Sequence, residues 1–78
     1  MQKQKIEPGI YKHYKGKHYK VITIEIATES LEKQVVYQAL YDDKDFGTNA
    51  IWIRPLSMFS ETIIIDGNEV PRFTKVSS

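Results

Sequence analysis

The 78-residue sequence predicts an all-β fold, a small SH3-like β-barrel of five to six short antiparallel strands. Apolar residues recur at a period of two in several short runs, and turns containing Gly, Asn or Asp separate these runs. No segment shows the 3.6-residue periodicity of a long amphipathic helix. A flat sheet of this size would leave its edges unpaired, so we expect the strands to close or bend strongly. An OB-like barrel is the less favoured alternative, because it needs a longer sheet and usually a helix.

The chain is expected to form a single domain over residues 8–76, between a flexible N-terminal segment at 1–7 and a short tail at 77–78. It contains no Cys, so neither a disulfide nor a thiolate metal site can stabilise so small a core. No apolar run reaches the roughly 18–20 residues that span a bilayer. The N-terminus also lacks the apolar region of a secretory signal, and we therefore expect a cytoplasmic protein.

The first two strands are expected at residues 10–14 and 18–28, joined by a tight turn in which Gly16 supplies the unusual backbone angle. The second strand changes phase along its length. Isoleucines alternate with polar residues in its later part, whereas the apolar residues before them fall out of step. A β-bulge near Val21 and Ile22 would correct the phase and bend the strand.

A second hairpin is expected from two β-prone arms, 35–41 and 50–59, which flank the polar loop 42–49. Pro55 ends the later strand, because proline cannot donate to a ladder. The segment Leu56–Phe59 is too short for a regular helix and is predicted to form a 3₁₀ turn that closes the barrel.

Positive charge is concentrated in the first third of the chain. Residues 1–24 contain six Lys against one Glu, whereas residues 25–78 contain five basic and nine acidic residues. If the first hairpin forms one side of the fold, that side is positive. The lysines then either keep edge strands from pairing with other sheets or form the footprint of an anion or a nucleic acid.

Catalytic and metal-binding patterns are absent from the sequence. There is no Cys nucleophile, and no Ser lies near a His in the sequence, so we expect the protein not to be an enzyme. His13 and His18 flank one turn, but no third ligand stands at a zinc-site spacing. The acidic loop lacks EF-hand spacing, because Arg54 is the twelfth residue counted from Asp43. No metal and no cofactor are therefore expected.

The aromatic side chains are too many for the interior of so small a domain, so we expect several of them at the surface. Beside basic residues they would suit stacking on bases and contact with an anionic group. Alternatively, they cap the barrel ends and pack between lysine stems. We predict a binding module for nucleic acid or a nucleotide. The residues predicted to form its ligand-binding face are Tyr11, His13, Lys15, Tyr37, Trp52 and Arg54.

Two of these residues are predicted to lie side by side. Strand alternation places Trp52 and Arg54 on one face, roughly 7 Å apart by strand rise. The same alternation places Ile51 and Ile53 on the opposite face. Trp52 and Arg54 could thus line a common groove.

The last strands are expected at residues 61–65 and 70–76, with a tight turn at 66–68. The consecutive apolar residues of 61–65 need cover on both faces. This favours an alternative function as a protein–protein interaction module, either by self-association or by binding an extended peptide through strand addition. A third class is an accessory domain for a hydrolase that acts on nucleotides.

The motifs PGIYKHYKGKHYKV, VVYQALY, IWIRPLSMF and VPRF resemble, in the same order, those of DUF1653, a bacterial family of unknown function. The chain departs from the family pattern at residues 27–30, where ATES stands in place of His-Ser-Glu-Thr, and in the longer loop at 42–49. The resemblance covers residues 8–73 and implies a small β domain without an established activity. By motif position, the family's residues map to Gly9, Tyr11, His13, Tyr14, Lys15, Gly16, Tyr19, Val21, Tyr37, Leu40, Tyr41, Trp52, Arg54, Pro55, Leu56, Met58 and Phe59.

Overall fold

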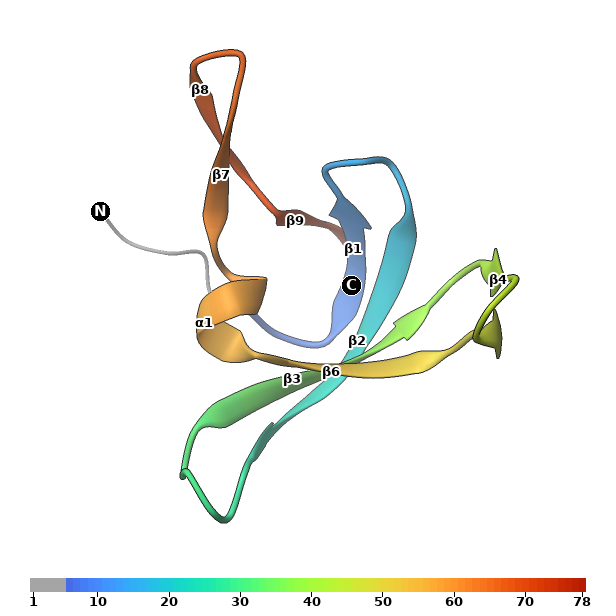
Figure 1. The fold of residues 1–78 in the computed structure, drawn as a ribbon, viewed down its shortest axis with the longest axis vertical. Helices are drawn as coiled ribbons and strands as arrows, with labels where there is room; N and C mark the ends of the chain where they lie inside the picture. The colour runs from blue at the N-terminus through green and yellow to red at the C-terminus, as the bar shows by residue number, and fades with distance from the viewer. Residues whose placement is uncertain (1–5) are drawn as a thin grey trace.

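The computed structural model describes residues 6–78, and all of the strand pairs in this part of the chain are antiparallel (Figure 1). Five strands form one sheet in the order β6–β3–β2–β1–β9, and two further pairs, β4–β5 and β7–β8, form separate hairpins. The predicted all-β class is confirmed. In chain order the elements are β1 (Gly9–His13), β2 (His18–Ile26), β3 (Lys33–Ala39), β4 (Asp42–Asp43), β5 (Gly47–Thr48), β6 (Ile51–Pro55), α1 (Leu56–Phe59), β7 (Thr62–Ile65), β8 (Asn68–Pro71) and β9 (Phe73–Ser77).

The five-stranded sheet curls but is not closed into a barrel. Within residues 6–78 no backbone pairing joins β6 to β9, which are the two free edges of the sheet. Pro55 cannot donate to a ladder at the end of β6. In place of backbone hydrogen bonds, a side-chain contact joins the two edges. The guanidinium carbon of Arg54 on β6 lies 5.7 Å from the ring centroid of Phe73 on β9. The predicted SH3-like barrel is therefore not confirmed.

Strand β2 contains the predicted bulge. Its pairing with β3 is regular up to Val21, shifts by one residue and resumes at Thr23. Because side chains alternate between the two faces of a strand, this shift lets both Val21 and Ile24 turn toward the core. The bulge thus explains the phase change in the sequence of β2.

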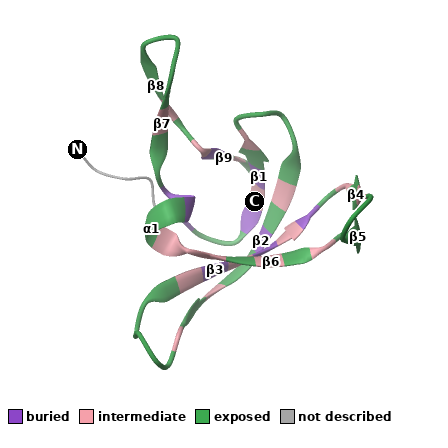
Figure 2. Cartoon of the chain, viewed as in Figure 1, coloured by how far each residue is buried: buried purple, intermediate pink, exposed green. Residues whose placement is uncertain are grey.

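Aromatic rings make up most of the core, which lies on the inner face of the curled sheet (Figure 2). Phe59 stacks on Phe73 with 4.0 Å between the ring centroids, and Tyr11 and Tyr37 meet the Phe59 ring edge-on. The sequence analysis expected some of these rings at the surface because the core is small, and this expectation is wrong for Tyr11 and Tyr37, which are buried. The largest fully buried side chains are Tyr11, Phe59, Phe73, Val21 and Val35.

The short segment after β6 is an α-helical turn and not the predicted 3₁₀ turn. The backbone N–H of Ser60 donates to the carbonyl of Leu56, four residues earlier, at 3.0 Å. The Ser60 hydroxyl donates to the same carbonyl at 2.9 Å, which favours the wider turn. This turn lays Phe59 against the inner face of the sheet. No helix within residues 6–78 is long and apolar enough to cross a membrane.

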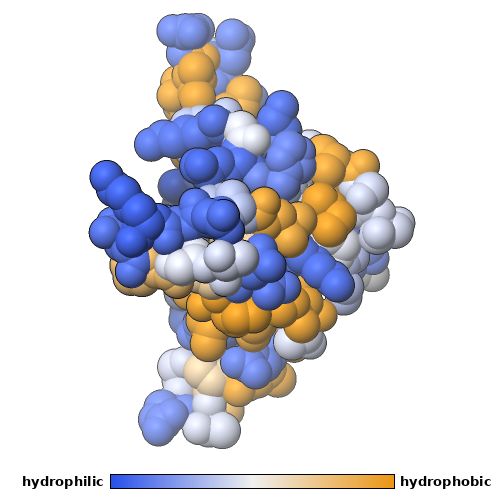
Figure 3. All heavy atoms as spheres, turned by 90° about the vertical axis from the view of Figure 1, so that its right-hand side faces the viewer, coloured by the Kyte–Doolittle hydropathy of each residue, from blue (hydrophilic) through white to orange (hydrophobic). Residues whose placement is uncertain are grey.

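The outer face of β2, β3 and β6 is open to solvent. Ile51 and Ile53 share this face, as predicted, and are 56% and 59% exposed, while Ile22 at the bulge is 40% exposed. Figure 3 views the right-hand side of Figure 1, where the β4–β5 hairpin lies, and shows apolar side chains among polar ones across the middle of that side. Aliphatic side chains thus lie on both faces of the sheet, whereas the rings of Tyr11, Tyr37, Phe59 and Phe73 all lie in the interior.

Candidate functional site

Tyr11 does not reach the surface, although the sequence analysis assigned it to the ligand-binding face. Its side chain is fully buried, and its hydroxyl donates to the carbonyl of Glu7 at 3.0 Å and accepts the N–H of the same residue at 3.1 Å. Curling of the sheet turns this part of β1 toward Phe59. Tyr11 is a core residue that fixes the chain entering the sheet, where Ile6 is also buried. Residues 1–5 of the predicted flexible segment lie outside the described residues.

Two other predicted residues differ sharply in exposure. Tyr37 is only 5% exposed and meets the rings of Phe59 and Phe73 edge-on. Lys15 is exposed in the turn after β1, where its ammonium lies 5.8 Å from the Tyr14 ring centroid. The structure therefore does not unite all six predicted residues on one open face.

Half-buried polar and aromatic side chains gather where the free edges of the sheet approach each other. His13 ends β1, Tyr19 lies on β2, and Arg54 reaches over Phe73 of β9. The ring centroid of His13 is 5.0 Å from that of Phe73, and that of Tyr19 is 5.6 Å from it. We call this group the seam cluster, and it consists of His13, Tyr19, Tyr37, Tyr41, Arg54 and Phe73.

The hydrogen bonds of the seam cluster leave donors available. The Nδ1 atom of His13 accepts the backbone N–H of Lys15 at 3.2 Å, so a neutral imidazole carries its proton on Nε2. The hydroxyls of Tyr19 and Tyr41 lie 2.8 Å apart. Only one of them can donate within this pair, and the O–H of the other can donate elsewhere. The cluster is thus built to offer hydrogens to a ligand.

The pKa values in the seam cluster indicate a cationic and partly dry environment. Burial lowers the pKa of His13 below its usual 6.5, and the nearby Arg54, Arg72 and Lys15 lower it further. Burial raises the pKa of Tyr37, an effect that Arg54 partly opposes. Burial and the hydrogen bond to the second tyrosine hydroxyl also raise the pKa of Tyr19. No carboxylate contributes to any of these shifts, so the cluster favours an anion.

The two arginines near His13 differ in their partners. Arg72 donates to the Glu61 carboxylate at 2.7 Å, and its buried Nε has no hydrogen-bond partner within the described chain. Arg54 forms no ion pair with any of residues 6–78 and has its guanidinium over an aromatic ring. Arg54 is therefore the cation best placed to meet an incoming negative group.

Further aromatic residues extend the site along β6. Trp52 is half-buried and lies on the same face of β6 as Arg54, as predicted. Its ring centroid is 4.9 Å from that of Phe46, which is 63% exposed in the loop between β4 and β5. Lys17 places its ammonium 4.3 Å from the Tyr41 ring centroid. An exposed aromatic surface thus adjoins the seam cluster.

Sequence reasoning missed several members of the site. Tyr19 could have been found, because a hairpin centred on Gly16 pairs it directly with Tyr11. Phe73 gave no local signal, since its place depends on the pairing of β9 with β1 across most of the chain. The position of Tyr41 could not be predicted either, because it depends on how the chain folds after the end of β3.

The two histidines of the first hairpin lie on opposite faces of the sheet. His13 lies on the inner face of the sheet, whereas His18 is exposed and pairs with the outward-facing Lys12. Within residues 6–78 no group of three or more His, Cys, Asp or Glu side chains could hold a metal ion. A separate open groove of about 470 Å³ lies between the β7–β8 hairpin and the β1–β9 pair, and it includes only His13 of the seam cluster.

The sequence matches the family described as "Protein of unknown function (DUF1653)" over residues 9–75. A crystal structure of a DUF1653 protein from Bordetella bronchiseptica is similar to this one, with a TM-score of 0.81 and 34% sequence identity. The similarity covers 97% of this chain and 94% of that one. No curated protein matches the sequence. The resemblance seen in the sequence motifs is therefore confirmed.

Proposed function

The chain belongs to the DUF1653 family, and we propose that it is a non-enzymatic binding module for a nucleotide or single-stranded nucleic acid. The ligand binds at the seam cluster, in the opening of an SH3-like sheet whose last edge is left unpaired. We place this activity in the bacterial cytoplasm, in keeping with a chain that lacks cysteine.

The observation that carries the proposal is the guanidinium of Arg54, which forms no ion pair with any of residues 6–78. A half-buried cation without a carboxylate partner is costly unless a ligand supplies the negative charge. The planar guanidinium can donate two parallel hydrogen bonds to a phosphate. The Nε2–H of His13 and a tyrosine hydroxyl add further donors beside it.

The aromatic residues next to Arg54 suit the base of a nucleotide. Trp52 is two residues from Arg54 on the same face of β6, and its ring contacts that of Phe46. Stacking of a base on such a ring contributes roughly 1–3 kcal/mol. Stacking does not depend strongly on base identity. The proposed ligand is therefore recognised by its phosphate and its ring, with little sequence preference.

Fluorescence anisotropy with labelled single-stranded RNA and DNA oligonucleotides at low salt tests the proposal. We expect saturable binding that weakens steeply as salt is added, because phosphate contacts release counterions. Unlabelled nucleoside monophosphates should compete. Loss of all binding at high protein concentration, to oligonucleotides and nucleotides alike, would contradict the proposal.

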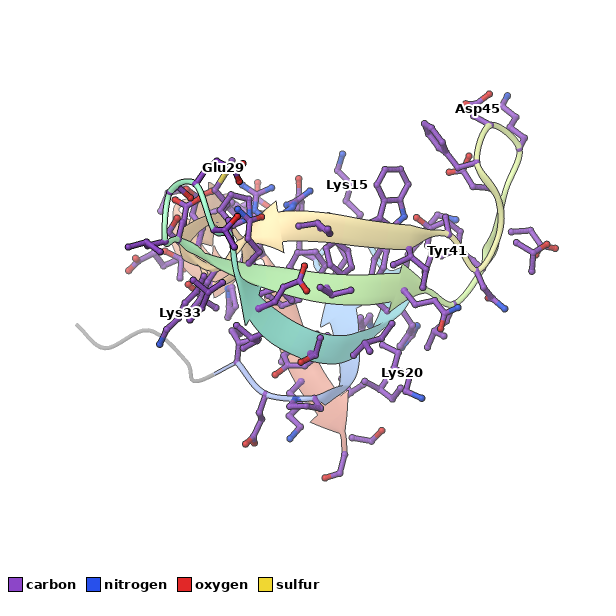
Figure 4. All side chains as sticks on the ribbon, turned by 90° about the horizontal axis from the view of Figure 1, so that it is seen from below. Lys15, Lys20, Glu29, Lys33, Tyr41 and Asp45 are labelled. Atoms are coloured by element: carbon purple, nitrogen blue, oxygen red, sulfur yellow. The ribbon has the colours of Figure 1, made fainter. Side chains whose placement is uncertain are left out.

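A matched pair of variants locates the site. Arg54→Gln should weaken binding by about tenfold or more, because it removes a charge-assisted bidentate contact. Lys33→Gln removes the same charge at the opposite end of the sheet from Tyr41 (Figure 4) and should change affinity by less than about twofold. Equal effects of the two substitutions would show diffuse attraction by net charge and not a site at the seam cluster.

A further inference from the structure

The outer face of the sheet is a second surface that the proposed ligand site does not use. It lies on β2, β3 and β6, which appear side by side in Figure 4. Strand pairing aligns Thr23, Val36 and Ile53 in one row across these strands. Ile22 at the bulge and Ile51 in the next row are exposed as well. The centre of this face is therefore apolar and uncovered.

Opposite charges stand on β2 on either side of the central row. Lys20 aligns with Gln38 on β3, whereas Glu25 aligns with Gln34. Both charged side chains are exposed, and within residues 6–78 neither of them forms an ion pair. The face thus carries a positive charge at one end and a negative charge at the other, with the uncharged row of Thr23, Val36 and Ile53 between them.

This pattern is complementary to itself. Two copies can be related by a two-fold axis that runs along the central row, perpendicular to the strands. In this arrangement β2 of one copy lies over β2 of the other, and the two strands run in opposite directions. Each Lys20 then faces Glu25 of the second copy, and Val36 and Ile53 face their own copies. The amide side chains of Gln38 and Gln34 are brought together across the interface, and Ile51 meets Pro55.

We propose that two copies of this chain associate through the outer faces of their sheets, as a symmetric face-to-face dimer. The arrangement is that of two aligned sheets packed about 10 Å apart. It covers the exposed isoleucines and leaves both seam clusters open on the far sides. The dimer does not depend on the proposed ligand, so each proposal can fail without the other.

Sedimentation velocity from micromolar to millimolar protein tests the dimer. The sedimenting mass of the wild-type protein should rise from that of the 9.1 kDa chain to twice this value. Lys20→Glu and Glu25→Lys should each raise the dissociation constant by about tenfold or more, because symmetry makes each substitution act twice. The double variant K20E/E25K should restore association close to the wild-type level.

Two further variants serve as controls. Ile53→Asp places a charge in the central row and should abolish the dimer. Lys44→Glu makes the same charge change as Lys20→Glu in the exposed turn between β4 and β5, and it should alter the dissociation constant by less than about twofold. Circular dichroism of each variant confirms that the monomer is folded, which is expected because all four positions are exposed.

Three outcomes overturn the dimer. The first is a wild-type protein that stays monomeric at all concentrations. The second is a double charge reversal that associates no better than the single ones. The third is association that survives Ile53→Asp, which would indicate strand addition at the free edge of β6 in place of face packing.

Discussion

The inner and outer faces of the sheet are made by the same strands, yet they differ in composition and in packing. On β6, Trp52 and Arg54 turn inward, while Ile51 and Ile53 turn to solvent. The inner face is filled by rings in edge-on and stacked contact, and the outer face carries aliphatic side chains that are exposed to solvent. Stability therefore comes mainly from one face. The exposed isoleucines of the other face contribute little to folding and are free to enter the dimer interface proposed above.

The largest expected difference between the two faces is in how much stability a side chain on each face contributes. Phe59→Ala should lower the free energy of unfolding by about 3–5 kcal/mol, because it removes the ring on which Phe73, Tyr11 and Tyr37 pack. Ile53→Ala on the outer face should lower it by less than about 1 kcal/mol. Urea unfolding measures both values, at a protein concentration low enough for any dimer to dissociate.

The control for the first substitution is Phe59→Leu, which keeps an apolar side chain. It should cost about 1–2 kcal/mol and keeps the comparison measurable if the alanine variant is unfolded. A loss for Ile53→Ala equal to that for the Phe59 variants would contradict the assignment of stability to the inner face.

A smaller effect separates the structural tyrosines from those of the seam cluster. Tyr11→Phe removes both hydrogen bonds to Glu7 and should lower the free energy of unfolding by about 1 kcal/mol. It should leave nucleotide affinity unchanged. Tyr41→Phe breaks the contact with the Tyr19 hydroxyl in a half-buried position, so it should weaken nucleotide binding more than it lowers stability. Fluorescence anisotropy measures the change in nucleotide affinity of each variant, and urea unfolding measures the change in its stability.

The smallest effect is a pH dependence of stability that involves His13 on the inner face. The pKa of His13 in the folded protein is below 6.5, so as the pH falls through this region the unfolded chain binds more protons. Stability should therefore fall from about pH 7.5 to about pH 5, and less so in His13→Gln. Equal slopes for wild type and His13→Gln would contradict the lowered pKa.

The local pattern of the sequence was sufficient to predict which residues share a face. Alternation separates Ile51 and Ile53 from Trp52 and Arg54, and the break in alternation locates the bulge beside Val21. These features depend on neighbours along one strand, which a period of two reports directly. The all-β class follows from the same signal.

Closure of the sheet and the contents of its core could not be predicted in this way. Both depend on contacts between segments far apart in the chain, above all the packing of Phe73 against His13 and Tyr19. The sequence analysis placed several rings at the surface, whereas the curl of the sheet lets Tyr11, Tyr37, Phe59 and Phe73 pack on one another in the core. Tyr11 was assigned to the ligand site for this reason, although its hydroxyl is satisfied by the backbone of Glu7.

The bulge in β2 has a consequence for which changes in chain length this strand can accept. Lys20 and Glu25 are an odd number of residues apart, so in a regular strand they would point in opposite directions. The unpaired Ile22 corrects this parity. Its deletion would join Val21 to Thr23 in regular alternation, so Thr23 and Glu25 would still point outward and Ile24 would still point toward the rings. Strand β2 can therefore lose one residue at the bulge without a change of polarity, whereas a strand without a bulge would have the polarity of all its later residues reversed by the same loss.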